Sequence, residues 1–528
     1  MPDATTSVLT RHNDNNRTGA YLQETQLNTS NVNQQQFGKL FAYHVDGQIY
    51  AQPLYVSNMN MADGDTHNVV YVATMHNMVY AFDADNPVAA NSPLWSRSLG
   101  SSAPLPDPNI GPVGPQGQSF YRDISVEVGI ISTPVISLDK NVIYVVAFTK
   151  VGNTYSHHLH ALDLVTGEER MGGPVQIVGS VQGNGYDSKN GTITFTSNRQ
   201  IQRAALLLAN NVVYIAFAAY GDAPPYHGWV FTYNATTLQR MAVYNTSPNG
   251  REGGIWQAGQ GLVADGDNNI YFITGNGTFT IDARNLGCAI VKLKPNLSLA
   301  DWFAPHNCVA LTNGDQDLGS AGALLIPGTN LLLGGGKESK FYLIQRDHMG
   351  HFNANNDDQI VQSFYVNLPG KDHYTHHIHS GPVYWNGPNG PWIYVWAEND
   401  YLKAYHFDGE KFQVTPVSTS TTRDPQNVPG GSIGMPGGFL SISANGNTPG
   451  TGIVWASHPY EQNANQAVVD GIVRAYDASD LTKELWNSKQ NASRDDIGKF
   501  AKFCPPTVAN GKVFVASFSG ELTVYSLL

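Results

Sequence analysis

The sequence predicts an all-β protein, an eight-bladed β-propeller built from four-stranded antiparallel blades. The first observation behind this fold class is one short strand pattern that recurs at 79–83, 159–163, 230–234, 289–293, 341–345, 402–406, 473–477 and 522–526. A strand repeat of about 50 to 80 residues indicates blades around an axis, because one unit cannot bury its own faces. The second observation is a supply of 53 glycines and 29 prolines, which suits many short strands joined by turns.

Each unit is predicted to hold four strands, counted outward from the axis. In the first unit they are 48–56, 68–74, 79–84 and 93–99, and in the second 129–137, 142–150, 158–164 and 173–179. Turn-forming residues separate them, as at 63–65 in the first unit.

The third observation concerns the two ends of the chain. The last unit offers only three strands, 505–508, 512–518 and 521–528, whereas an unassigned strand lies at 37–45. Because closure of the ring removes exposed strand edges, we expect the N-terminal strand to complete the last blade. The predicted organisation is therefore an N-terminal strap over 1–36 and a single propeller domain over 37–528.

Composition limits the partners and the location. The net charge of −12 and the lack of a Lys/Arg cluster argue against nucleic acid. The apolar stretch 204–220 is divided by Asn210 and Asn211, so it predicts two strands and no membrane span. The first residues contain no apolar segment typical of a signal peptide, and the polar, charge-poor composition resembles that of exported proteins. We expect a secreted or periplasmic mature form, with a cytoplasmic location left open.

The long loops are predicted to lie on one face of the propeller. Strands alternate in direction, so the connections between blades emerge on the same side as the second hairpin of each blade. Because functional residues gather on loops held by a rigid scaffold, a small-molecule or glycan ligand is expected at this mouth of the channel.

The densest polar patch on that face contains His373, His376, His377 and His379. On an extended backbone His377 and His379 point the same way, whereas His376 points away. Two imidazoles form half of a transition-metal site, which His76 or His227 from other blades would complete. The alternative is that these histidines satisfy buried backbone groups or line a wet channel.

Asp315 and Asp317 form a second candidate group, just before a predicted inner strand. Alternate carboxylates at this place suit a hard cation or a general base. They equally suit a turn that caps the strand.

Two units share a further pattern, formed by Ala81, Asp83 and Trp95 in the first and by Ala475, Asp477 and Trp486 in the seventh. With the eight units and the stretch 11–18, this pattern resembles the quinoprotein alcohol and methanol dehydrogenases. That family consists of eight-bladed propellers that bind pyrroloquinoline quinone (PQQ) and a calcium ion at the channel mouth.

The resemblance is strongest at 254–346. It implies that Asn276 ligates calcium, that Asp317 is the catalytic base and a calcium ligand, and that Lys337 contacts the quinone. By this resemblance, calcium polarises a quinone carbonyl, Asp317 takes the proton of a substrate hydroxyl, and a hydride passes to the quinone.

The chain departs from the family pattern at three places. The segment 149–158 has no acid where the family has a calcium-ligating Glu, so Glu127 is the candidate replacement. Trp256 is the candidate for the ring beneath the quinone, but it is two residues out of register and Ala258 takes the aligned place. No two cysteines are neighbours, so the family's adjacent-cysteine disulfide is absent.

Three functions follow as alternatives. The first is a PQQ- and calcium-dependent oxidoreductase of an alcohol or sugar; it would need a separate electron acceptor, because no Cys-x-x-Cys-His haem site is present. The second is a metal-dependent hydrolase or lyase that uses the channel-mouth histidines. The third is a binding or scaffold propeller without chemistry.

Overall fold

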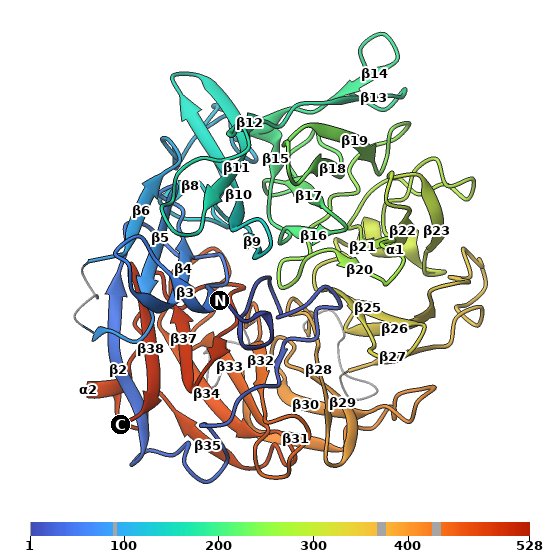
Figure 1. Ribbon diagram of the computed structural model, residues 1–528. Helices are drawn as coiled ribbons and strands as arrows, with labels where there is room; N and C mark the ends of the chain where they lie inside the picture. Colours follow the sequence, from blue (N-terminus) through green and yellow to red (C-terminus); the bar gives the residue numbers. More distant parts are fainter. Residues whose placement is uncertain (1, 88–91, 367–375, 425–433) are drawn as a thin grey trace.

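The computed structural model describes residues 2–87, 92–366, 376–424 and 434–528. Over these residues the chain forms eight four-stranded antiparallel blades around a central axis (Figure 1). The predicted fold class is confirmed.

The first four blades follow one another along the chain, each from its inner to its outer strand. Blade one is β3 (Leu54–Asn60), β4 (Thr66–Ala73), β5 (Met78–Asp83) and β6 (Trp95–Ser98); blade two is β9 (Val135–Ser137), β10 (Val142–Val151), β11 (Thr154–Asp163) and β12 (Val175–Gln176); blade three is β16 (Leu207–Ala209), β17 (Val212–Ala219), β18 (Trp229–Asn234) and β19 (Arg240–Asn245); blade four is β20 (Val263–Ala264), β21 (Ile270–Ile273), β22 (Ile290–Leu293) and β23 (Leu299–Phe303).

The other four blades continue in the same order, and the last takes its outer strand from the N-terminal region. Blade five is β24 (Gly322–Leu325), β25 (Leu331–Gly335), β26 (Lys340–Gln345) and β27 (Gln362–Tyr365); blade six is β28 (Val383–Gly387), β29 (Gly390–Val395), β30 (Tyr401–His406) and β31 (Ser418–Arg423); blade seven is β32 (Phe439–Ser443), β33 (Ile453–Pro459), β34 (Gly471–Asp477) and β35 (Glu484–Asn487); blade eight is β36 (Thr507–Ala509), β37 (Lys512–Ala516), β38 (Glu521–Leu527) and β2 (Phe37–His44).

Several short elements are additional to the four strands of each blade. They are β1 (Ala20–Tyr21), which pairs with β32; the pair β7 (Ala103–Pro104) and β8 (Glu127–Val128); the pair β13 (Ser180–Gln182) and β14 (Thr192–Thr194); β15 (Gln200–Ile201), which pairs with β17; and the helices η1 (Ala4–Thr6), η3 (Ser197–Arg199), α1 (Cys308–Asn313) and α2 (Ala492–Asp495). None of the helices in the described part of the chain has the length and apolar content needed to cross a membrane.

Strand β17 shows why the alternating pattern encodes stacked blades. All eight of its residues are buried. Val213, Ile215 and Phe217 pack into a core shared with blade two, whereas Tyr214 and Ala216 pack into a core shared with blade four. Because successive side chains point to opposite faces of a strand, both faces are apolar when a blade has a neighbour on each side.

Several inner strands begin later than the sequence predicts. The strands expected from 48, 129 and 505 begin at Leu54, Val135 and Thr507, each directly after a proline. Proline has no backbone N–H to donate to the ladder, so regular pairing begins after it.

The ring closes as expected. β2 pairs with β38 from Phe37↔Leu527 to His44↔Glu521, with a register shift after Lys39. The ring of Phe37 packs edge-on against Trp486, with 5.0 Å between ring centroids. By completing blade eight, the N-terminal strand pairs with the edge of β38 that would otherwise be exposed.

Residues 8–19 cross the axis and visit the inner strands in ring order. Their backbone bonds pair Val8 with Tyr55, Leu9 with Ile136, Asn15 with Ala264, Asn16 with Leu325, Thr18 with Tyr384 and Gly19 with Ile442. Figure 1 shows this dark blue segment across the centre of the ring. The segment therefore links blades one, two, four, five, six and seven on one face.

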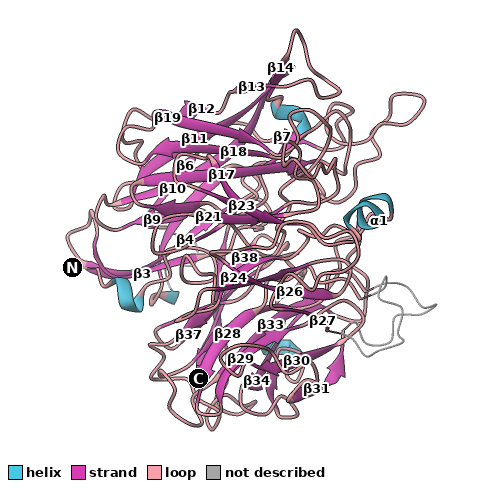
Figure 2. Ribbon diagram, turned by 90° about the vertical axis from the view of Figure 1, so that its right-hand side faces the viewer, coloured by secondary structure: helices cyan, strands magenta, loops and turns pink. Residues whose placement is uncertain are grey.

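Two buried arginines fix this segment from inside the channel. Arg11 donates to the carbonyl oxygens of Gly259 and Phe503, and Arg17 donates to those of Leu206 and Leu262. Buried cations need such partners, because an unpaired buried charge is very costly. The N-terminus and α1 lie on opposite sides of the molecule in the side view (Figure 2).

Candidate active site at the channel mouth

A cavity of about 450 Å³ opens on the face opposite the N-terminal segment. Its walls come from the connections between blades and from the second hairpins of blades three, five, six and seven, which the alternating strand directions place on one face. Asp317, Lys337, Trp256, His377 and His379 all line it. The cavity thus brings together five of the residues singled out from the sequence.

Asp317 and Lys337 form the centre of an acidic group. Lys337 Nζ lies 2.7 Å from Asp317 Oδ2 and 3.2 Å from Asp315 Oδ1. Asn276 donates its backbone N–H to Asp317 Oδ1 at 3.0 Å and its side-chain amide to Asp315 Oδ1 at 2.8 Å. Burial opposes the charge of Lys337, but the carboxylates of Asp317 and Asp315 outweigh it and raise its pKa.

The backbone around this group approaches too closely for larger residues. A Cβ atom at Gly336 would collide with the carbonyl oxygens of Asp317 and Leu318, and one at Gly275 would collide with the Asp317 carboxylate. Glycine permits such close approach because it has no side chain. These two glycines therefore allow the β21 and β25 ends to hold Asp317 between them.

Asp222 adds a third carboxylate from blade three. Tyr226 donates its hydroxyl to Asp222 Oδ1 at 2.6 Å. Surrounding protein atoms, followed by the Asp317 carboxylate, raise the pKa of Asp222 to about 7. Residue 222 as a whole is exposed because it lies at the open mouth, so water screens part of this effect. The loop assignment placed Asp222 on this face, but no motif marked it as functional.

Aromatic and apolar residues form part of the wall. Trp256 is half-buried and Ala258 lies near it along the same loop; both line the cavity. The Trp256 side chain is therefore present at the cavity although its sequence register differs from the family pattern.

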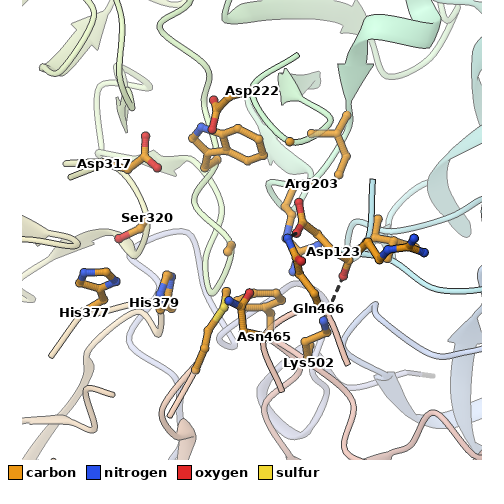
Figure 3. A pocket seen from close by; sticks show the side chains of 18 of the residues that line it. Asp123, Arg203, Asp222, Asp317, Ser320, His377, His379, Asn465, Gln466 and Lys502 are labelled. Carbon is orange, nitrogen blue, oxygen red and sulfur yellow. Dashed lines mark hydrogen bonds between the residues drawn. The ribbon is translucent and has the colours of Figure 1, made fainter. Parts of the chain in front are cut away.

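A second group lies beside Ser320. His379 Nε2 is 2.9 Å from Glu398 Oε1, and His377 Nδ1 is 3.4 Å from Glu398 Oε2. Figure 3 shows His377 and His379 on the same side of the cavity as Ser320 and Asp317. The two histidines therefore point to the same side of the cavity, as strand geometry predicts, whereas no sequence pattern indicated that Glu398 would lie beside them.

Cations line the other side of the cavity. The guanidinium of Arg203 lies 4.0 Å from the centroid of the Phe503 ring, and Lys502 donates to the carbonyl oxygen of Asp123 at 3.0 Å (Figure 3). Among the described residues, Lys502 donates to backbone carbonyl oxygens and neither cation forms an ion pair with a carboxylate. Burial lowers the pKa of Lys502 to about 8, and Arg203 contributes to that shift.

Three predicted site residues lie away from the cavity. Glu127 pairs with His76 at 3.0 Å, because β8 pairs with β7 and turns the carboxylate toward blade one. His227 pairs with Asp187 at 2.8 Å through one ring nitrogen and with Ser247 through the other. None of these three residues lines the cavity, and Asn276 is not in its wall either but donates to Asp317 and Asp315. His373 lies outside the described residues.

Comparison with known proteins gives a relationship at the level of the fold. No family model matches the sequence, and no curated protein matches it. Among solved structures, the fold is similar to quinohemoprotein alcohol dehydrogenase ADHIIG from Pseudomonas putida HK5, with a TM-score of 0.59 and 14% identity over 99% of this chain and 80% of that one. It is also similar to quinohemoprotein alcohol dehydrogenase from Comamonas testosteroni, with a TM-score of 0.54 and 16% identity over 99% of this chain and 81% of that one. The chain therefore has the propeller fold of these quinoprotein dehydrogenases.

Proposed function

We propose that this protein is an oxidoreductase that binds PQQ and calcium in the channel-mouth cavity and oxidises an alcohol or a sugar hydroxyl. The observation that carries the proposal is the arrangement of Asp317, which is 4% exposed, ion-paired to Lys337 and hydrogen-bonded by Asn276 in the cavity wall. An acid held in this way beside a cavity is suited to accept a proton from a bound substrate.

The acidic group fits a calcium ion. Asp222, Asp315, Asp317 and Asn276 offer oxygen ligands, which is the donor type that calcium takes. The side-chain oxygen of Asn276 is buried and has no hydrogen-bond partner among the described residues. Two carboxylates pair with the one ammonium group of Lys337, and Asp222 lies close enough that, after burial, the negative charges of Asp317 and Asp315 also raise its pKa. A bound divalent cation would offset the negative charge of these carboxylates.

The rest of the cavity fits PQQ. This cofactor is a flat aromatic acid, so it needs an apolar surface and cations for its carboxylates. Trp256 supplies the surface, whereas Arg203 and Lys502 supply positive charge on the opposite side. When bound, the quinone, polarised by calcium, supplies the acceptor for a substrate hydride.

The residues of this chain would do three things. Asp317 accepts the proton of the substrate hydroxyl at its carboxylate. Lys337 keeps a positive charge next to that carboxylate, and Asn276 fixes its orientation through the bond to Oδ1. Arg203 would hold an anionic group of the cofactor on the side of the cavity away from Asp317.

The proposal extends to the fate of the electrons and to the location. The sequence contains no Cys-x-x-Cys-His haem attachment site, so a separate acceptor takes the electrons. The polar composition with only 14% charged residues supports a secreted or periplasmic location.

The test is reconstitution of the purified protein with PQQ and calcium, followed by reduction of an artificial dye on a panel of alcohols and aldoses. Turnover by the wild type, and its loss in Asp317→Asn, supports the proposal. Asp267→Asn is the matched control, because Asp267 is an exposed turn residue of blade four. Bound PQQ with no turnover on any member of the panel would reduce the proposal to a cofactor-binding role.

A further inference from the structure

We infer that His377, His379 and Glu398 form a site for one divalent first-row transition-metal ion in the wall of the same cavity. This site is separate from the oxygen-rich group at Asp317, and it goes beyond the proposed function because neither the quinone nor calcium requires it. The inference rests on the distances between the three side chains, their burial, and the way the backbone holds them.

Two of the three pairs of side chains already have donor atoms at metal-ligand spacing. His379 Nε2 and Glu398 Oε1 are 2.9 Å apart, and His377 Nδ1 and Glu398 Oε2 are 3.4 Å apart. One potential ligand atom from each of the three residues lies within 4.8 Å of the others. Ligands about 2.0–2.2 Å from one zinc ion lie about 3.0–3.5 Å apart in tetrahedral or octahedral geometry. Small side-chain rotations therefore bring all three onto one ion.

The backbone fixes the three residues relative to one another. The backbone N–H of Glu398 donates to the carbonyl oxygen of His377 at 3.0 Å. Ser320 donates its hydroxyl to the carbonyl oxygen of Ile378 at 2.7 Å, so the residue between the two histidines is tied to the next loop. A site held in this way loses little conformational entropy when an ion binds.

The charge of Glu398 supports the same conclusion. Glu398 is 1% exposed, and among the described residues its ion-pair partners are the two histidines and no Lys or Arg. Its Oε2 is buried and receives no hydrogen bond from the described residues. A buried carboxylate needs a paired positive charge. A divalent ion bound between the three side chains would supply it.

The ligand set indicates the class of ion. Two imidazoles and one carboxylate are typical of zinc and of non-haem iron(II) sites that keep open coordination positions. All three side chains line the cavity, so the open positions face it. A water molecule or an oxygen atom of a bound ligand, such as a hydroxyl or carboxylate, would complete the coordination.

The test is a titration of tag-free, chelator-treated protein with zinc alone, in competition with a chromophoric chelator. We expect one tight equivalent per chain, and a loss of at least about 100-fold in affinity for both His379→Ala and Glu398→Gln, since removing a direct ligand exceeds the effect of an outer partner. Cobalt(II) in place of zinc should give visible d–d absorption that both substitutions abolish. Near-ultraviolet circular dichroism checks that the variants fold, and Glu398→Gln keeps the side-chain shape.

His67→Ala is the matched control. His67 belongs to the other described group of metal-type ligands, with Asp63 and Asp65 at an exposed turn. We expect this substitution to leave the tight equivalent unchanged. Absence of a tight equivalent in the wild type overturns the inference, and so does tight binding that persists in His379→Ala and Glu398→Gln. Because the titration contains neither PQQ nor substrate, its failure is distinguishable from failure of the proposed function.

Discussion

Lys337 and Asp317 are joined twice, through their side chains and through their backbones. Nζ of Lys337 lies 2.7 Å from Oδ2 of Asp317, and the backbone N–H of Lys337 donates to the carbonyl oxygen of Asp317 at 3.0 Å. The hairpin of blade five therefore holds the inter-blade loop that carries the acid. This double connection fixes the carboxylate in the cavity wall before any ligand arrives.

The first prediction concerns the charge of Lys337. Lys337→Met should lower kcat/KM of the reconstituted enzyme by about 100-fold, because a preorganised charge beside the reacting group is lost. Lys337→Arg keeps a cation and should retain most of the activity. Steady-state dye reduction measures both variants. Equal rates for Lys337→Met and wild type would show that the ammonium group has no part in the reaction.

The second prediction concerns Asp222 and calcium. The raised pKa of about 7 means that Asp222 holds a proton below neutral pH and must release it to ligate a cation. Calcium affinity should therefore rise between pH 6 and pH 8, by up to about tenfold per pH unit below the pKa. Calorimetry in buffers of different ionisation enthalpy measures the released proton.

Asp222→Asn supplies the control for this pH dependence. It should bind calcium more weakly, and its remaining affinity should not change with pH over that range. Asp267→Asn should behave as the wild type. The same pH slope in Asp222→Asn as in the wild type would exclude Asp222 from the site.

The third prediction concerns the cationic side of the cavity. The pKa of Lys502 is lowered to about 8, mainly by burial, so the ammonium group loses its proton as the pH rises through 8. Affinity for PQQ should therefore be full at pH 7 and lower at pH 9. Lys502→Arg stays charged over this range and should bind PQQ with little change in affinity between the two pH values. Quenching of tryptophan fluorescence measures binding; equal wild-type affinity at pH 7 and pH 9 would rule out a role for Lys502.

The fourth prediction concerns the segment that crosses the axis. Arg17 is fully buried and donates to the carbonyl oxygens of Arg11, Leu206 and Leu262. Arg17→Met leaves these oxygens without a donor and should lower the free energy of unfolding by at least about 3 kcal/mol. A clear fall in the melting temperature should follow. Arg97→Met, at an exposed position of β6, should change it little.

Much of the fold is predictable because short, local patterns of apolar and polar residues determine it. The alternation at 212–219 puts apolar side chains on both faces of one strand, which only a blade between two neighbours can bury. The pairing of β2 with β38 follows from counting strands, since the last unit lacks one. β3 and β9 begin later than the alternation alone predicts, because Pro53 and Pro134 have no backbone N–H to donate to the strand ladder.

The site is predictable only where neighbouring residues carry the signal. His377 and His379 lie two positions apart, so their common direction follows from strand geometry. Glu398 comes from blade six, whereas Asp222 and Arg203 come from different loops of blade three, and all three are single polar residues in ordinary surroundings. Their meeting at one cavity depends on loop shape, which a short sequence pattern does not encode. Glu127 was the expected replacement for a calcium ligand, but the pairing of β7 with β8 directs its carboxylate to His76.

The most direct test of the proposed function compares wild type and Asp317→Asn after loading with PQQ and calcium. The bound quinone is quantified by its absorption, and dye reduction is then followed on the alcohol and aldose panel. The wild type should bind one quinone per chain and turn over, whereas Asp317→Asn should bind the same amount and lose about 100- to 10,000-fold in kcat. No quinone bound by the wild type, or equal turnover by the two proteins, would contradict the assignment of Asp317 as the base of a PQQ-dependent oxidoreductase.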